Sequence, residues 1–309
     1  MTGTHDELDL RFPATSANLG PAFDTAALAL NLHLRVQARA AVKTSIEAKG
    51  RDVALCSKLE NHLIIAVYRQ TLAAHQQHAT PLALRLENQI PIGKGCGSSA
   101  AARLAGVALA VRFGGLGWSA QQVFELAAQL EGHPDNAAAC WWGGLTVAQA
   151  QASDGWRWQQ VDLATAWPLL LAVPPKPLAT SRARKLLPAR YRRESAVANI
   201  QNAVMLIQAL QHGRGELLAA AFADHMHQPF RAVLCPLWPI LEPLAGQSGI
   251  LGCALSGAGP SVLMVIRDAA SMQEAKTAAQ AALDAASAEA ELIETTIEVH
   301  GPGLEWHPR

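Results

Sequence analysis

Alternating hydrophobic and polar positions mark two strands in the first third of the chain. Apolar side chains occupy every second position of LNLHLRVQA (residues 30–38) and of LALRLE (residues 82–87). Because successive side chains of a strand point to opposite faces, this alternation predicts strands with one buried face. The apolar run PLLLAVPP, which prolines bracket over residues 168–175, predicts a third strand.

Helical spacing of apolar residues appears between and after these strands. It predicts helices over residues 60–75 and 98–113, the second of which stops at Gly114 and Gly115. Ser119 is a suitable N-cap for a third helix that runs to Glu131. Further along, we expect helices over 194–211, 215–226 and 270–288, and strands over 261–266 and 291–300.

These elements predict an α+β fold in two domains. The chain has 309 residues, which is more than one hydrophobic core usually organises. The segment 149–158 is polar and broken, so we expect the domains to comprise residues 1–160 and 161–309. A cleft between two such domains is a frequent ligand site.

Composition narrows the class of ligand. The 25 Lys and Arg balance 25 Asp and Glu, so no basic excess favours nucleic acid or an anionic membrane. The five cysteines lack a C-x-x-C pair, which predicts reduced thiols rather than disulfides or a zinc site. No run reaches the roughly 18 apolar residues of a membrane span, and the first residues lack a signal-peptide core. We therefore expect a cytoplasmic protein that binds a small molecule.

The stretch IPIGKGCGSSAAA (residues 90–102) carries a clear chemical signal. Three alternating glycines lead into the predicted helix 98–113, whose first two residues are serines. Unobstructed backbone N–H groups, the helix N-terminus and two hydroxyls together suit a phosphate, and the glycines would clear space for it. A tight turn without a ligand is the alternative. The pattern is neither a Walker A loop nor the G-x-G-x-x-G dinucleotide fingerprint.

Three stretches, in order, resemble the three motifs of the GHMP small-molecule kinases. They are RFPATSANLGPAFDTAALAL (residues 11–30), the glycine loop, and ALSGAGPSVLMV (residues 254–265). Three more resemble segments of the bacterial homoserine kinases in that superfamily: EGHPDNAAACWWGGLTV (131–147), TSRARKLLP (180–188) and DHMHQPFRAVL (224–234). The resemblance implies an N-terminal domain like the second domain of ribosomal protein S5 and a ferredoxin-like C-terminal domain.

The same resemblance implies a site for ATP and Mg²⁺. The phosphates would be wrapped by the loop residues Pro91, Ile92, Gly93, Lys94, Gly95, Cys96, Gly97, Ser98, Ser99, Ala100 and Ala101. Asn61 and Leu63 would contact the adenine. Mg²⁺ prefers hard oxygen ligands, which would be the hydroxyl of Ser99 and the carboxylate of Glu131 or Glu125. We favour Glu131 of the two.

Homoserine carries an α-carboxylate, an α-ammonium group and a primary hydroxyl. The resemblance places these residues in its site: Asn18, Asp24, His133, Asn136, Thr180, Arg184, Arg231 and Gly257. Asp24 would bind the ammonium group, and the guanidinium forks of Arg184 and Arg231 would bind the carboxylate. Asp24 could instead cap a helix, and each arginine could be a solvated charge.

Catalytic roles would fall to Asp135, Asn136 and Arg184. Phosphoryl transfer depends mostly on positioning and electrostatics, so the hydroxyl could attack directly, or Asp135 could act as a base. The implied reaction is the ATP- and Mg²⁺-dependent phosphorylation of L-homoserine to O-phospho-L-homoserine in threonine biosynthesis, by an enzyme that forms homodimers. A kinase for another small alcohol and a non-catalytic nucleotide- or metabolite-binding sensor are the alternatives.

Overall fold

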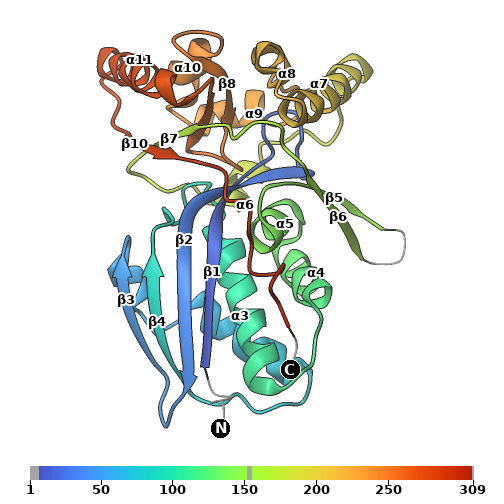
Figure 1. Cartoon of the computed structure of the whole chain (residues 1–309), viewed down its shortest axis with the longest axis vertical. Helices are drawn as coiled ribbons and strands as arrows, with labels where there is room; N and C mark the ends of the chain where they lie inside the picture. Colours follow the sequence, from blue (N-terminus) through green and yellow to red (C-terminus); the bar gives the residue numbers. More distant parts are fainter. Residues whose placement is uncertain (1–6, 152–154, 308–309) are drawn as a thin grey trace.

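The computed structural model describes residues 7–151 and 155–307, which form two sheets with helices packed against each (Figure 1). The first sheet has six strands. Five follow the order β3 (Ser45–Gly50), β4 (Leu82–Asn88), β2 (Ala26–Ala40), β5 (Leu145–Ala150) and β6 (Trp156–Val161), and β1 (Glu7–Ala17) also pairs with β2. The two alternating patterns predicted β2 and β4 correctly, and they pair antiparallel from Leu34 opposite Asn88 to Ala40 opposite Leu82.

The helices of the first domain are α1 (Val53–Cys56), α2 (Leu63–Ala74), α3 (Ser98–Gly114), α4 (Ala120–Glu131) and α5 (Asp135–Trp142). The central helix, α3, packs against α2, α4, α5 and β1, and this packing buries nearly every side chain from Ala100 to Val111. That burial explains the apolar run in the sequence. Among the described residues, no helix combines the length and the hydropathy needed to cross a bilayer.

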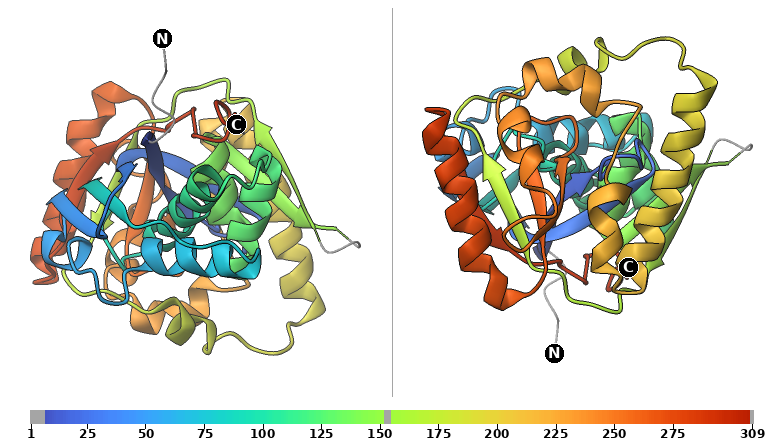
Figure 2. Two further views of the ribbon diagram at one scale, coloured as in Figure 1. Left: turned by 90° about the horizontal axis from the view of Figure 1, so that it is seen from below. Right: turned by 90° about the horizontal axis from the view of Figure 1, so that it is seen from above.

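The second sheet follows the order β10 (Glu291–Thr295), β7 (Leu169–Val173), β9 (Val262–Ile266) and β8 (Ile250–Leu255), and all its pairs are antiparallel. The main helices are α7 (Arg193–Gln211), α8 (Leu218–Ala221) and α11 (Met272–Ala285). Figures 1 and 2 show them on the side of this sheet away from the first domain. The chain order β7, α7, β8, β9, α11, β10 is the ferredoxin-like arrangement that the resemblance implied.

Three segments differ from the sequence-based expectations. Residues 215–226 are not one helix, because α8 ends at Ala221 and the chain then turns at Asp224. The carboxylate of Asp224 accepts the backbone N–H groups of Met226, His227 and Gln228, which starts the short helix α9 (Gln228–Arg231). The expected helix 60–75 starts only at Leu63, and the expected strand 291–300 ends at Thr295.

Residues 296–307 leave the second sheet and return to the first domain. The N–H of Asn31 donates to the carbonyl of Thr296 at 2.9 Å, and Ile297 forms a bridge with Leu30 of β2. The Trp306 ring packs against the Trp141 ring of α5, with centroids 5.4 Å apart. Figure 1 shows this dark red segment running down beside α5 and α4. The end of the described chain thus joins the two domains.

Candidate active site

The glycine loop connects β4 to α3 and turns at every second residue. Gly93, Gly95 and Gly97 have φ values of 70°, 80° and 70°, the left-handed region that glycine enters without steric cost. Gly97 is the N-cap residue of α3, and no side chain caps this helix. The unpaired N–H groups of the first turn therefore remain available to an anion.

The glycines also serve a purpose that the sequence did not reveal. A Cβ atom on Gly95 would overlap the carbonyl oxygen of Ser256, and one on Gly97 would overlap the hydroxyl of Thr15. Besides the predicted space for a phosphate, the absence of a side chain at these two glycines lets the third and first motifs approach the loop. The hydroxyl of Ser256 donates to the carbonyl of Gly95 at 2.7 Å, which fixes this contact between the domains.

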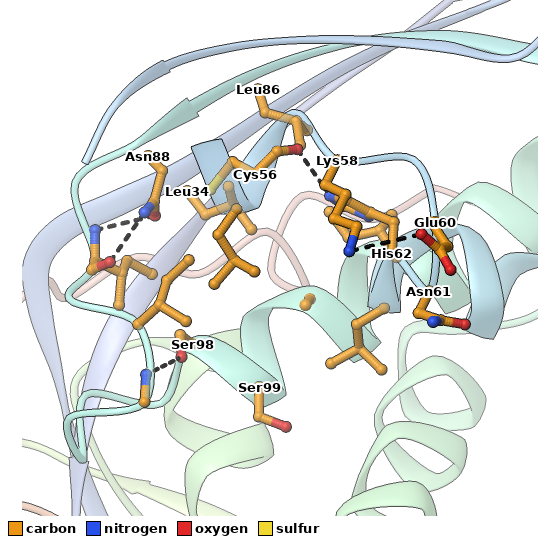
Figure 3. A pocket seen from close by; sticks show the side chains of 17 residues that line it. Leu34, Cys56, Lys58, Glu60, Asn61, His62, Leu86, Asn88, Ser98 and Ser99 are labelled. Carbon is orange, nitrogen blue, oxygen red and sulfur yellow. Dashed lines mark hydrogen bonds and ion pairs between the residues drawn. The ribbon is translucent and has the colours of Figure 1, made fainter. Parts of the chain in front are cut away.

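Two cavities meet at the start of α3. The larger has a volume of about 350 Å³ and a mostly apolar lining that includes Asn61, Leu63 and Ile92. Figure 3 shows Ser98 and Ser99 on its helix side and Lys58, Glu60 and Asn61 on the segment before α2. The smaller cavity has a volume of about 100 Å³, and we call it the polar cavity because many charged and polar residues contribute to its lining. Gly93, Ser98 and Ser99 line both, so a ligand can extend from one to the other.

The polar cavity brings most of the predicted residues together. It is lined by Asn18, Asp24, Gly93, Gly95, Cys96, Gly97, Ser98, Ser99, Ala100, Glu131, His133, Asp135, Asn136, Thr180, Arg184, Arg231 and Gly257. Four described residues that were predicted for the site, Pro91, Lys94, Ala101 and Glu125, line neither cavity. Ala101 is fully buried in the core of the first domain, which explains its absence from the lining.

Asn18 ties the first motif to the third. Its Nδ2 donates to the carbonyl of Gly257 at 2.7 Å, and its Oδ1 accepts the backbone N–H of Asp24 at 2.9 Å. Asn18 has a φ of 70°, and asparagine tolerates this conformation better than most residues. Both polar groups of the amide are engaged, so Asn18 holds the two motifs in place at the wall of the cavity.

Asp24 and Arg184 pair with each other across the polar cavity. Nη1 and Nη2 of Arg184 donate to the two carboxylate oxygens of Asp24 at 2.9 and 2.6 Å. This hydrogen-bonded pair raises the pKa of Arg184. Arg184 is the last residue of α6 (Thr180–Arg184), and its side chain is 36% exposed. The two charges are therefore paired, but a ligand in the cavity can still reach them.

Arg231 is a buried cation, only 1% exposed, on α9. Its Nη1 donates to Nδ1 of His227 at 3.1 Å, while its Nε has no hydrogen-bond partner within the described residues. Burial and the nearby charge of Arg184 lower the pKa of Arg231. The Phe23 ring lies 5.1 Å from the Arg231 guanidinium and 5.6 Å from that of Arg184. A buried cation without an anionic partner indicates a place for an anion.

His133, Asp135 and Asn136 form a hydrogen-bonded group at the start of α5. Oδ1 of Asp135 lies 2.6 Å from Nδ1 of His133 and accepts the backbone N–H of Asn136 at 2.7 Å. Burial lowers the pKa of His133, but the hydrogen bond and charge of Asp135 outweigh it and raise this pKa overall. Oδ1 of Asn136 accepts the hydroxyl of Thr15 at 2.6 Å. The group is thereby anchored to β1.

Ser99 and Glu131 lie close enough to share one cation. Nη1 of Arg103 contacts both the hydroxyl of Ser99 and Oε1 of Glu131. A hydroxyl and a carboxylate are oxygen donors of the kind that Mg²⁺ prefers, so this pair fits the metal. Oε1 of Glu125 instead accepts Nε2 of Gln121 at 2.8 Å, away from the cavity. Of the two carboxylates that we considered, only Glu131 lies beside Ser99.

Comparisons with known proteins identify the family of this chain. Residues 62–144 match the family model "GHMP kinases N terminal domain", and residues 206–285 match "GHMP kinases C terminal". A homoserine kinase of Solibacter usitatus is 41% identical over 265 residues, which are 85% of this chain and 86% of the relative. The chain belongs to the homoserine kinase family of the GHMP kinases.

Other members of the homoserine kinase family are also similar along most of their length. A homoserine kinase of Synechocystis is 34% identical over 86% of this chain and 88% of its own. The crystal structure of the homoserine kinase of Cytophaga hutchinsonii superposes with a TM-score of 0.81 at 24% identity, over 97% of this chain and 98% of that one. The structural match supports the two-domain GHMP kinase fold.

Sequence reasoning missed three residues that contact the predicted site residues: Thr15, Arg103 and His227. Arg103 did leave a signal, because it is the one charged residue in the apolar run from Ala100 to Val111. Its distance of four residues from Ser99 places both on one helix face. Thr15 and His227 left no comparable signal, since their roles depend on partners more than a hundred residues away, Asn136 and the Gly20 carbonyl.

Proposed function

We propose that this protein transfers the γ-phosphoryl group of ATP to the hydroxyl of L-homoserine, giving ADP and O-phospho-L-homoserine for threonine biosynthesis. The observation that carries the proposal is a single polar cavity that contains both the glycine loop and two guanidinium groups beside one carboxylate, Asp24. Membership of the homoserine kinase family supports it. The adjoining apolar cavity, with Asn61 and Leu63 in its wall, would take the adenine.

The charged groups of the cavity complement an amino acid. The acceptor carries one negative and one positive group on the same carbon, and Arg184 and Asp24 carry the opposite charges side by side. The substrate carboxylate would bind Arg231, whose Nε has no partner within the described residues, together with Arg184, and its ammonium group would bind Asp24. If Arg184 exchanges partners in this way, each charged group of the set would lie beside an opposite charge when the substrate binds.

The reaction needs the acceptor hydroxyl and the γ-phosphorus in line. The hydroxyl oxygen forms a bond to the γ-phosphorus, the bond to the bridging oxygen of ADP breaks, and the hydroxyl proton passes to an oxygen of the transferred phosphoryl group. The N–H groups at the start of α3 would hold the phosphates, while Asn136, which Thr15 orients, would position the acceptor. Mg²⁺ held by Ser99 and Glu131 would neutralise charge on the phosphates.

We expect the Asp135→Asn variant to keep turnover within about tenfold of the wild type. The Asp135 carboxylate is already engaged by His133 and by the N–H of Asn136, which suits a positioning role, whereas loss of a general base typically costs about 10²–10⁴-fold. Steady-state kcat checks this prediction. A loss near a thousandfold with unchanged KM would instead make Asp135 the base.

The deciding experiment measures ADP release from Mg-ATP by the purified protein with L-homoserine, L-serine, L-threonine, mevalonate or galactose. ³¹P NMR identifies the product. We expect turnover with L-homoserine alone. Preference for another alcohol would leave the fold and overturn the substrate, and nucleotide binding without any turnover would favour a metabolite sensor. An acceptor without a carboxylate would also have no use for Arg231, whose burial argues against that alternative.

The cellular setting of the proposed enzyme follows from its family. We expect a cytoplasmic homodimer, which fractionation and sedimentation velocity of the full chain would check. The balance of 25 cationic and 25 anionic residues suits neither nucleic acid nor an anionic membrane as a partner.

A further inference from the structure

Arg103 occupies an unusual position in α3. The helix from Ala100 to Val111 is otherwise uncharged and packs in the core of the first domain. The side chains of Arg103 and Glu131, which form an ion pair, are 23% and 10% exposed. Partial burial of a charge costs free energy unless other groups compensate for the lost water, so the contacts of Arg103 point to a specific role for this side chain.

The direction of the side chain brings Arg103 to the phosphate site. Helical side chains lean toward the N-terminus, so a residue one turn after Ser99 extends back over the first turn of α3. There Nη1 contacts the Ser99 hydroxyl and Oε1 of Glu131. A guanidinium has five N–H donors, and these two contacts use only one of its nitrogens. The remaining donors can serve another anion.

Arg103 binds the same two oxygens that fit Mg²⁺. A metal ion and a guanidinium repel each other and cannot both occupy the space between Ser99 and Glu131. Nε2 of His133 lies 4.0 Å from the other oxygen of Glu131, so Arg103 and an imidazole lie on opposite sides of the carboxylate. A divalent ion must displace Arg103 to bind the Ser99 hydroxyl and Oε1 of Glu131 together.

We propose that the Arg103 guanidinium competes with the divalent metal for the Ser99 hydroxyl and the Glu131 carboxylate. When the metal binds these two oxygens, Arg103 moves away from them and binds the nucleotide phosphates. The inference rests on the proposed kinase function, because it requires a metal and a nucleotide at α3. It follows that the protein alone binds metal weakly. It also follows that ATP can bind without metal, since Arg103 masks the charge of Glu131.

A purely structural role for Arg103 makes the opposite prediction. In that case the residue only connects α3 to the end of α4, where a cation also complements the helix dipole. Its removal would loosen Ser99 and Glu131, and metal affinity would fall or stay the same. Competition requires that removal of Arg103 increase metal affinity.

The test uses Arg103→Met, which keeps an apolar stem and removes the charge, in the full chain. Mn²⁺ is the metal probe, and its free concentration is measured by electron paramagnetic resonance without nucleotide. We expect the variant to bind Mn²⁺ about tenfold more tightly than the wild type, because the positive charge that competes with the metal is removed. Calorimetry with ATP in EDTA should show about tenfold weaker binding, because Glu131 then faces the phosphates without a counter-charge.

Arg112→Met is the matched control, because Arg112 lies on the same helix and donates to the carbonyl of Glu7 instead. It should change neither affinity. If Arg103→Met does not fold, Arg103→Gln removes the charge and keeps hydrogen-bonding groups, and the same two shifts are expected. Unchanged or weaker Mn²⁺ binding, or unchanged ATP binding in EDTA, overturns the proposal. Failure of the wild type to bind Mg-ATP at all would instead refute the kinase function.

Discussion

At the scale of single residues, the buried charge of Arg231 makes a sharp prediction. Arg231→Met should raise the KM for L-homoserine by about 100-fold and change the KM for ATP by less than about twofold. The free energy of unfolding should equal or exceed that of the wild type, because a buried cation with an unpartnered Nε is removed. Kinetics and urea denaturation check both parts.

The control for Arg231 is Arg182→Met, an exposed arginine two residues before Arg184. It should leave both KM values unchanged. Equal losses of affinity for ATP and L-homoserine in Arg231→Met would contradict a role in the acceptor site. A large loss of stability would show that Arg231 serves the fold.

His227 predicts how stability depends on pH. Burial lowers its pKa to about 4, with Asp224 opposing this shift and Arg231 adding to it. Because the unfolded chain takes up this proton near pH 6.5, the contribution of His227 to stability is complete above that pH and is lost as the pH falls toward 4. His227→Gln should flatten this part of the stability profile, by up to about 1.4 kcal/mol per pH unit.

Urea denaturation at pH 7.0, 6.0 and 5.0 measures the His227 effect. His212→Gln, which changes an exposed histidine after α7, should retain the wild-type slope. The prediction fails if His227→Gln keeps the wild-type slope as well. In that case other groups would control acid sensitivity.

The sequence predicted which residues belong to the site but not the contacts between them. The resemblance to the GHMP kinases indicated Arg184, Arg231, Asp24 and Ser99, and the ligands that guanidinium, carboxylate and hydroxyl groups prefer suggested what each would bind. The sequence could not show that Asp24 and Arg184 pair with each other, since 160 residues separate them. The choice between Glu131 and Glu125 likewise required the orientation of α4 relative to Ser99.

At the scale of elements, α4 offers a direct test. Ser119 caps it through a reciprocal pair of bonds with Gln122, and the same helix places Glu131 at its other end. Ser119→Ala should lower the free energy of unfolding by about 1 kcal/mol. Urea denaturation of Ser119→Ala, Gln122→Ala and the double variant checks this, and the double variant should lose less than the sum because the two bonds form one unit.

Predictions of elements succeeded where local signals were complete. Ser119 as N-cap and Gly114–Gly115 at the end of α3 are local features, and they fixed α3 and α4 to within a residue. Residues 215–226 have helical spacing, but the Asp224 carboxylate accepts three backbone N–H groups from residues 226–228, and the chain turns there. The strand β10 stops at Thr295 because a distant partner, β2, takes the residues that follow. Such competition is invisible in a local pattern.

At the scale of the whole molecule, the packing of residues 296–307 onto the first domain predicts a stabilising role for Trp306. Its ring packs on Trp141, and its Nε1 donates to the carbonyl of Trp118 at 3.0 Å. Trp306→Ala should lower the free energy of unfolding by about 2–3 kcal/mol, somewhat below the cost for a fully buried tryptophan. Leu304→Ala, an exposed neighbour, should cost less than about 0.5 kcal/mol. Equal effects in urea denaturation would contradict a specific role for the indole.

The return of residues 296–307 also has a consequence for biosynthesis. The strands and helices of the first domain leave the ribosome first, yet Trp141 and β2 lack their cover until Trp306 has been made. At typical rates of translation, the interval between Val161 and Trp306 is roughly 10–30 s. We expect the nascent domain to expose the apolar surface around Trp141 during that time.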